Sequence, residues 1–146
     1  GMTDKNTIEL LGQLLVCHYR SLPMFLTEAA PWVHRGDEEA SEVLNDIVAS
    51  QKRMCRRLAS EIEQRGGIVD VGDYPIDFLD FHFLSLDYML QRVCEYQRKE
   101  IVSLGRSAEQ LYADPAASAI AKEALGAARG HLESLEELLA KIPQND

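Results

Sequence analysis

The feature that most limits how this chain can fold is the spacing of its apolar residues, which repeat with a helical period over four long stretches. The stretches cover residues 6–30, 37–65, 74–112 and 115–142. Prolines and glycines separate them, and no stretch alternates with the two-residue period of a strand. Four amphipathic helices in 146 residues predict an all-α four-helix bundle that forms a single domain over residues 1–146.

Local signals support most of these boundaries. Asp37 and Asp114 stand where helix N-caps are expected, and Pro115 suits the first helical turn. The glycine pair at 66–67 is a strong stop signal for the second helix. Pro23 lies inside the first stretch, where it removes a backbone donor and clashes with the preceding turn. We therefore expect a kink or a break there.

The connection between the second and third helices is unusually long. It reads "GGIVDVGDYPID", about twelve residues, and could reach ~40 Å when extended at ~3.3 Å per residue. A helix of ~27 residues has the same length at 1.5 Å per residue. The other two connections are short enough for antiparallel hairpins. This pattern predicts a long crossover between helices 2 and 3.

Two stretches carry a resemblance to a known superfamily. They are "LASEIEQRGGIVDVG" at 58–72 and "AARGHLESLEELLAK" at 127–141. With the short, long, short order of connections, they resemble the ferritin-like superfamily, which contains ferritins, bacterioferritins and rubrerythrins. The resemblance implies a ferritin-like four-helix bundle. In that family a di-iron site takes a glutamate from each of two helices and Glu-x-x-His from each of the other two.

The family's ligands are not retained in this sequence. The fourth helix reads Ala128-x-x-His131 at the motif position, and the second reads Gln51-x-x-Met54. The chain contains no Glu-x-x-His, and the third helix offers a carboxylate only at the edge of its inward face, Glu100. A di-iron site of the family type is therefore not expected, and we predict no metal, no other cofactor and no catalytic residue.

A polar cluster is predicted where that site would lie. His18, Gln51, Gln97 and His131 each fall near the middle of a helix, so they share one layer in a bundle. They could hydrogen-bond one another or trapped water, as buried polar groups do. Alternatively, His18 and His131 could bind one metal, with Cys17 or Cys94 as third ligand if turned inward, or the layer could hold a small ligand.

The third stretch is predicted as one continuous helix with Leu79 on its inward line. Phe81, Leu84 and Tyr88 lie on the opposite face, which suggests burial against a partner. We expect either a homodimer interface there or cover from the "IVDV" part of the crossover. The second predicted helix carries three arginines close together, Arg53, Arg56 and Arg57. We expect them to form a solvated outer face or, alternatively, an anion site.

Net charge and cysteine content indicate which classes of partner and which compartment the protein suits. A net charge of −9 disfavours nucleic acid and anionic membrane surfaces, because both need clustered lysine and arginine. No apolar stretch approaches the ~20 residues needed to span a bilayer. The N-terminus does not read as a signal peptide. Three cysteines without a CxxC pair are expected to be buried apolar groups and favour the reducing cytoplasm.

Together these features predict a ferritin-like protein without a di-iron site that works as a non-enzymatic binding or interaction protein. The alternative is a metal-binding or redox protein with a rearranged site around His18 and His131. A third hypothesis is a helical bundle unrelated to ferritins.

Overall fold

The computed structural model describes the backbone of residues 2–29, 38–83 and 85–142, and the side chains of 4–28, 38–80 and 85–142. These residues contain only helices and connections, which confirms the predicted all-α class. No helix in this part of the chain combines the length and the apolar character needed to cross a membrane. The elements are α1 (Met2–Tyr19), α2 (Leu22–Met24), the π-helix η1 (Phe25–Ala29), α3 (Glu38–Gln64), the 3-10 helix η2 (Ile76–Phe83), α4 (Leu86–Gln110) and α5 (Pro115–Lys141).

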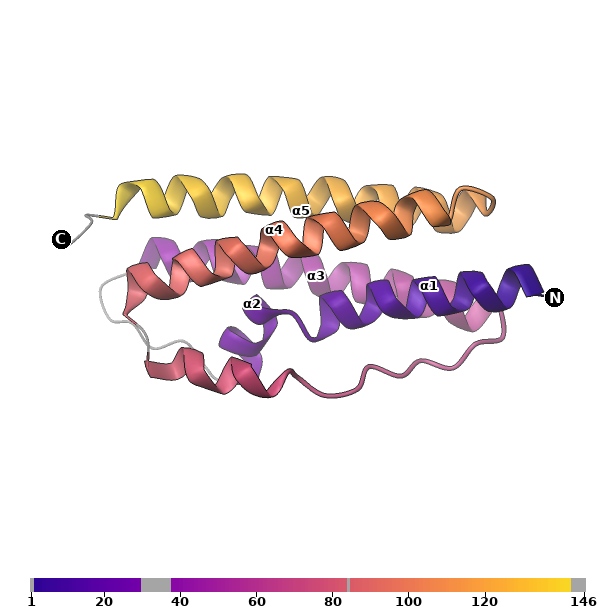
Figure 1. The fold of residues 1–146 in the computed structure, drawn as a ribbon, viewed down its shortest axis with the longest axis horizontal. Helices are drawn as coiled ribbons and strands as arrows, with labels where there is room; N and C mark the ends of the chain where they lie inside the picture. The colour runs from indigo at the N-terminus through magenta and orange to yellow at the C-terminus, as the bar shows by residue number, and fades with distance from the viewer. Residues whose placement is uncertain (1, 30–37, 84, 143–146) are drawn as a thin grey trace.

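Four long helices lie side by side, with α1 packed on α3, α4 on α5, and α3 also on α5 (Figure 1). α1 and α3 run in opposite directions, as do α4 and α5. The extended segment 65–75 leaves the end of α3 and returns along the length of the bundle to η2 (Figure 1). α3 and α4 therefore point the same way, and the extended segment and η2 together carry the chain back to the start of α4.

Two glycines end α3 where the crossover begins, and a capping aspartate starts α5. Gly66 adopts a φ of 78°, which favours glycine, and its N–H donates to the Glu63 carbonyl. A Cβ on Gly67 would lie 2.7 Å from an Ile8 side-chain carbon, so the chain can pass here only without a side chain. At the start of α5, the Asp114 carboxylate accepts the Ala117 N–H at 3.1 Å.

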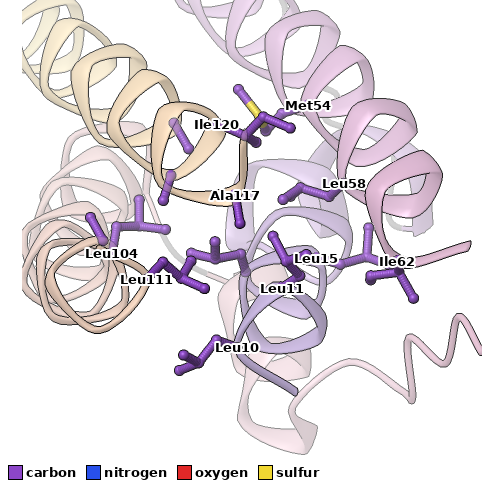
Figure 2. Packing of buried hydrophobic residues seen from close by; sticks show 14 of the residues in the cluster. Leu10, Leu11, Leu15, Met54, Leu58, Ile62, Leu104, Leu111, Ala117 and Ile120 are labelled. Atoms are coloured by element: carbon purple, nitrogen blue, oxygen red, sulfur yellow. The ribbon is translucent and has the colours of Figure 1, made fainter. Parts of the chain in front are cut away.

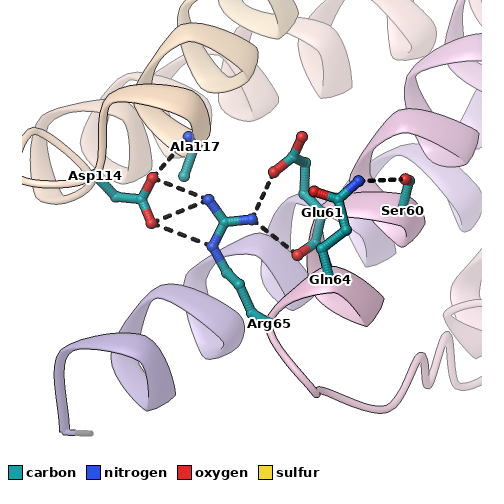
Figure 3. A network of polar contacts seen from close by, with 6 residues as sticks. All are labelled: Ser60, Glu61, Gln64, Arg65, Asp114 and Ala117. Carbon is teal, nitrogen blue, oxygen red and sulfur yellow. Dashed lines mark hydrogen bonds and ion pairs between the residues drawn. The ribbon is translucent and has the colours of Figure 1, made fainter.

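The crossover begins beside a polar network that joins two helix ends (Figure 3). Arg65 donates to both carboxylate oxygens of Asp114, at distances from 2.9 to 3.1 Å, and also to the side chain and carbonyl of Glu61. Because Asp114 also caps α5, one guanidinium ties the end of α3 to the start of α5. The guanidinium holds the pKa of Asp114 below its ordinary value.

The first predicted helix is interrupted near Pro23, as expected. α1 ends at Tyr19, and Ser21 is extended with φ −70° and ψ 160°. The Ser21 hydroxyl accepts the Met24 N–H at 3.2 Å, so it caps α2, and Pro23 occupies its first turn. The break therefore lies two residues before the proline, at the position that can cap a new helix.

The predicted continuous helix over 74–112 is wrong. Residues 76–83 form the 3-10 helix η2, and Ser85 is extended with φ −66° and ψ 160° before α4 begins at Leu86. A 3-10 helix has three residues per turn, so inward positions counted at 3.6 residues per turn move out of phase. Leu79, expected in the core, is 56% exposed, whereas its neighbour Phe78 is 2% exposed.

Aromatic rings hold η2 and the end of the crossover against the bundle. The Phe25 ring lies 5.2 Å from the Tyr74 ring and 5.6 Å from the Phe78 ring. The Phe78 ring also meets Tyr96 of α4 edge-on at 5.3 Å. This cluster fixes where the returning chain lies relative to η1 and α4.

The end of the bundle near the N-terminus is filled by aliphatic side chains from all four long helices (Figure 2). Leu11 of α1, Leu58 of α3, Ala117 of α5 and Leu111, just after α4, are at most 2% exposed. We call this cluster the apolar end layer. Its members shown in Figure 2 include Leu10, Leu11, Leu15, Met54, Leu58, Ile62, Leu104, Leu111, Ala117 and Ile120.

Candidate functional site

The four polar residues that the sequence places at mid-helix line one cavity in the structure. His18 comes from the last turn of α1, Gln51 from α3, Gln97 from α4 and His131 from α5. The cavity between them measures about 20 Å³, which is enough for a single water molecule. We call these four residues the central polar layer.

His18 is buried and oriented by its own helix. Its Nδ1 lies 2.7 Å from the Leu14 carbonyl oxygen. A carbonyl can only accept, so Nδ1 carries the proton and Nε2 is left as an acceptor. Burial lowers the pKa of His18, and the bond to Leu14 opposes this only in part. The ring is therefore neutral at pH 7.

Gln51 is held by a residue that the sequence did not single out. The Ser21 hydroxyl donates to the Gln51 Oε1 at 2.7 Å and accepts from the Met24 N–H. The break between α1 and α2 thus positions the amide of Gln51. No spacing signal predicts this contact, because thirty residues separate the two partners in the chain.

Gln97 and His131 are bonded to neighbouring helices. The Gln97 Nε2 donates to the Ala128 carbonyl at 3.0 Å, and the His131 Nε2 lies 3.0 Å from the Ser50 hydroxyl. Ala128 stands where the family motif has glutamate, and its small side chain leaves the backbone of α5 accessible to Gln97. Burial, the nearby His18 and the Arg53 charge lower the pKa of His131.

These contacts bear on one of the two predicted arrangements, hydrogen bonds among the four residues themselves. The sequence suggested that the four polar residues hydrogen-bond one another or a trapped water. Within the described part of the chain, no hydrogen bond joins two members of the layer. Each of the four makes one hydrogen bond, to a serine hydroxyl or to a backbone carbonyl, so the layer is a set of separately anchored groups.

Cys17 and Glu100 extend the cavity on the side between α1 and α4. The Glu100 carboxyl is hydrogen-bonded to the Cys17 thiol and to Tyr96, yet burial outweighs both bonds and raises its pKa. Burial and the Glu100 charge raise the pKa of the Cys17 thiol to about 12. Cys17 therefore stays a protonated thiol at neutral pH, which is neither a good nucleophile nor a ready metal ligand.

The other cysteine considered as a ligand lies elsewhere. Cys94 is buried in the core, at 1% exposed, and belongs to the apolar cluster around Phe25 and Phe78. All three cysteines are free thiols. Among the residues that the structure describes, no three His, Cys, Asp or Glu side chains are grouped closely enough to hold a metal ion.

The predicted outer patch is only partly visible. Leu84 and the side chain of Phe81 lie outside the described residues. Tyr88 is 44% exposed, and Arg92 stacks on its ring at 5.3 Å and donates to its hydroxyl. Tyr88 is therefore at the surface of α4, as the sequence predicted for the face away from the core.

Comparisons with known proteins identify no relative: no family model, no curated protein and no solved structure matches this chain.

Proposed function

We propose that this protein is a ferritin-like bundle without a di-iron site and that it acts as a non-enzymatic binding or interaction protein. Support for the ferritin-like part comes from the topology. A long crossover makes α3 and α4 parallel, while short connections make α1–α3 and α4–α5 antiparallel pairs (Figure 1). One polar side chain from each long helix meets at the centre, where that family places its metals.

The observation that carries the proposal is the neutrality of the central polar layer. Its two glutamines are uncharged, and burial keeps both histidines neutral. The carboxyl that lines the same cavity, Glu100, has a raised pKa and a neutral thiol as its neighbour. Divalent iron in a di-iron site is balanced by several carboxylates, and this layer does not provide that negative charge.

Metal analysis tests this proposal directly. Purified protein is incubated with Fe(II), Mn(II) or Zn(II), desalted and analysed for bound metal. We expect well under one metal per chain, unchanged in His18→Ala and His131→Ala. One or two metals per chain, lost in both variants, would contradict the proposal.

The same cavity supports a second candidate function, a rearranged mononuclear metal or redox site. It is favoured because Cys17 and Glu100 join the two histidines around one cavity, although their side chains are not grouped for coordination in this structure. Metal binding would then have to deprotonate Cys17. Co(II) distinguishes the two functions, since thiolate coordination gives an intense charge-transfer band that Cys17→Ser would remove.

We further propose a cytoplasmic homodimer whose interface includes Phe81, Leu84 and Tyr88. The three free thiols fit a reducing compartment. The exposure of Tyr88, and of Ile76 (86%) and Leu79 (56%) in η2, supports an interface near the start of α4. Light scattering on Tyr88→Asp should show monomers where the unmodified protein shows dimers. An unchanged mass, with Glu133→Lys on α5 as control, would count against this interface.

A further inference from the structure

A second hollow, at the surface, does not involve the central polar layer. It is a surface pocket of about 450 Å³, within the usual range for small-molecule sites. Its walls come from the end of α1, from α2 and η1, from the middle of α3 and from the crossover. The returning chain passes along α1 and α2 (Figure 1) and contributes Tyr74 to the pocket wall.

One wall carries an arginine fixed between two aromatic rings. The Arg20 guanidinium carbon lies 4.8 Å from the Tyr19 ring centre and 4.7 Å from the Tyr74 ring centre. Its Nε donates to the Gly72 carbonyl at 2.8 Å. An arginine held in this way loses little freedom on binding an anion, and it has donors beyond the one used by Gly72.

The opposite wall, on α3, carries two more cations. Lys52 is paired with Glu28 at 2.6 Å, so its charge is compensated. Arg56 is exposed and makes no ion pair with any described residue. In a chain with net charge −9, the pocket therefore holds two uncompensated positive charges, those of Arg20 and Arg56.

Between these walls the pocket is lined by apolar groups. Met24 and Cys55 are buried, at 5% and 7% exposed. Burial raises the pKa of the Cys55 thiol to about 11, so it lines the pocket as a neutral group. The rings of Tyr19 and Tyr74 add flat apolar surface. A lining of this kind suits a ligand with an apolar body, and two cations suit one small anionic group at its end.

We propose that this pocket binds a small organic carboxylate with a planar apolar body, whose carboxylate pairs with Arg20 and Arg56. A polyphosphate ligand fits less well, because only two of the three cations are free and Glu28 adds a negative charge at the rim. The site goes beyond the function proposed for the central layer and uses none of its four residues.

The test uses 2-naphthoate and its uncharged analogue 2-naphthamide, with binding measured by isothermal titration calorimetry on the full chain. We expect one saturable site for naphthoate and binding at least about tenfold weaker for the amide, because one charge-assisted contact is worth about 1.4 kcal/mol. Amide-resonance mapping by NMR should place the largest shifts at residues 19–20, 52–56 and 74.

Two arginine variants on α3 test whether the charge that binds naphthoate lies in the pocket. Arg56→Gln should weaken naphthoate binding about tenfold, whereas Arg53→Gln, an equally exposed arginine that does not line the pocket, should leave it unchanged. Arg20→Gln should weaken it as well, with circular dichroism to verify folding. Absence of saturable binding, equal affinity for the amide, or equal effects of the Arg53 and Arg56 variants would overturn the proposal.

This outcome is separable from that of the metal analysis. Naphthoate binding tests the pocket between α1, α3 and the crossover, whereas metal binding tests the central polar layer. A pocket that fails to bind naphthoate would leave the metal-free centre as proposed, and a metal at the centre would leave the pocket proposal standing.

Discussion

The apolar end layer and the central polar layer are built on the same four long helices, yet they use different chemistry. In the end layer, Leu11, Leu58 and Leu111 fill the space between helices with aliphatic carbon. Two turns along α1 from Leu11 stands His18, and two turns before Leu104 on α4 stands Gln97, both lining a small cavity. The helices could continue the aliphatic pattern through the centre, so packing alone does not account for the polar groups there.

Hydrogen bonds explain how the polar side chains of the central polar layer can be buried in the bundle. His18 and Gln97 bond to backbone carbonyls, and Gln51 and His131 bond to serine hydroxyls. Such bonds remove the penalty of burial but add only about 0.5–1.5 kcal/mol each. From this comparison we expect the apolar end layer to contribute more to the free energy of unfolding than the central polar layer does.

The largest effect expected from this comparison is at Leu58, which is fully buried in the end layer. Leu58→Ala should lower the free energy of unfolding by about 2–5 kcal/mol, because it leaves a cavity between four helices. Urea unfolding followed by circular dichroism measures the loss. Val102→Ala, at an exposed position in α4, is the control and should change stability by no more than about 0.5 kcal/mol.

The second largest effect expected is a dependence of stability on pH. It should come from the central cavity, because the apolar end layer has no histidine or carboxyl group. The pKa of His18 is lowered from its ordinary 6.5, so below pH 6.5 the unfolded chain binds a proton that the folded chain does not. Stability should therefore fall on acidification toward pH 5, by at most about 1.4 kcal/mol per pH unit for this residue. The raised pKa of Glu100 acts in the opposite direction as the pH approaches its ordinary 4.5.

Urea unfolding of the unmodified protein and of His18→Gln between pH 7 and pH 5 measures this dependence. We expect the variant to lose less stability on acidification, with His131, whose pKa is also lowered, accounting for part of the remaining change. Identical pH dependence in the two proteins would show that His18 is not the buried neutral group described above.

The smallest effect is expected at Gln97. Gln97→Leu removes the bond to the Ala128 carbonyl, but that carbonyl lies inside α5, where it also accepts a helical N–H. Stability should change by less than about 1 kcal/mol in either direction. A loss comparable to that of Leu58→Ala would mean that the central amide is structurally required, and the contrast between the layers would fail.

Sequence patterns predicted much of the fold because they act locally. Helical periodicity located α3 and α5 to within a residue or two, and chain length alone showed that the connection after Gly66 could span the bundle. The third helix was mispredicted because an apolar stretch looks the same in a 3-10 helix and in an α-helix until its register is known. Ser85 is polar but carries no signal that distinguishes a cap from a surface residue.

The central polar layer and the pocket differ in how far they could be foreseen. Gln51, Gln97 and His131 could be grouped because each lies well inside a helix of 25–27 residues. His18 was also expected at mid-helix, but it lies in the last turn of the 18-residue α1, so its place in the layer depends on the break before α2. The different surroundings of the three arginines on α3 could not be predicted from the sequence. Only the structure distinguishes Arg56, which lines the pocket, from Arg57, which pairs with Glu123, and from Arg53.

By itself, then, the sequence determined the helical class, the breaks near Pro23 and at the glycine pair, the reach of the crossover and the absence of the Glu-x-x-His ligands. The tertiary structure alone decided the hydrogen-bond partner that Gln51 finds in Ser21, the turning of Cys17 toward the cavity and the pocket beside Arg20. These features depend on the rotation of each helix about its axis and on contacts between residues far apart in the chain. Both are set by packing, which acts on the whole chain at once.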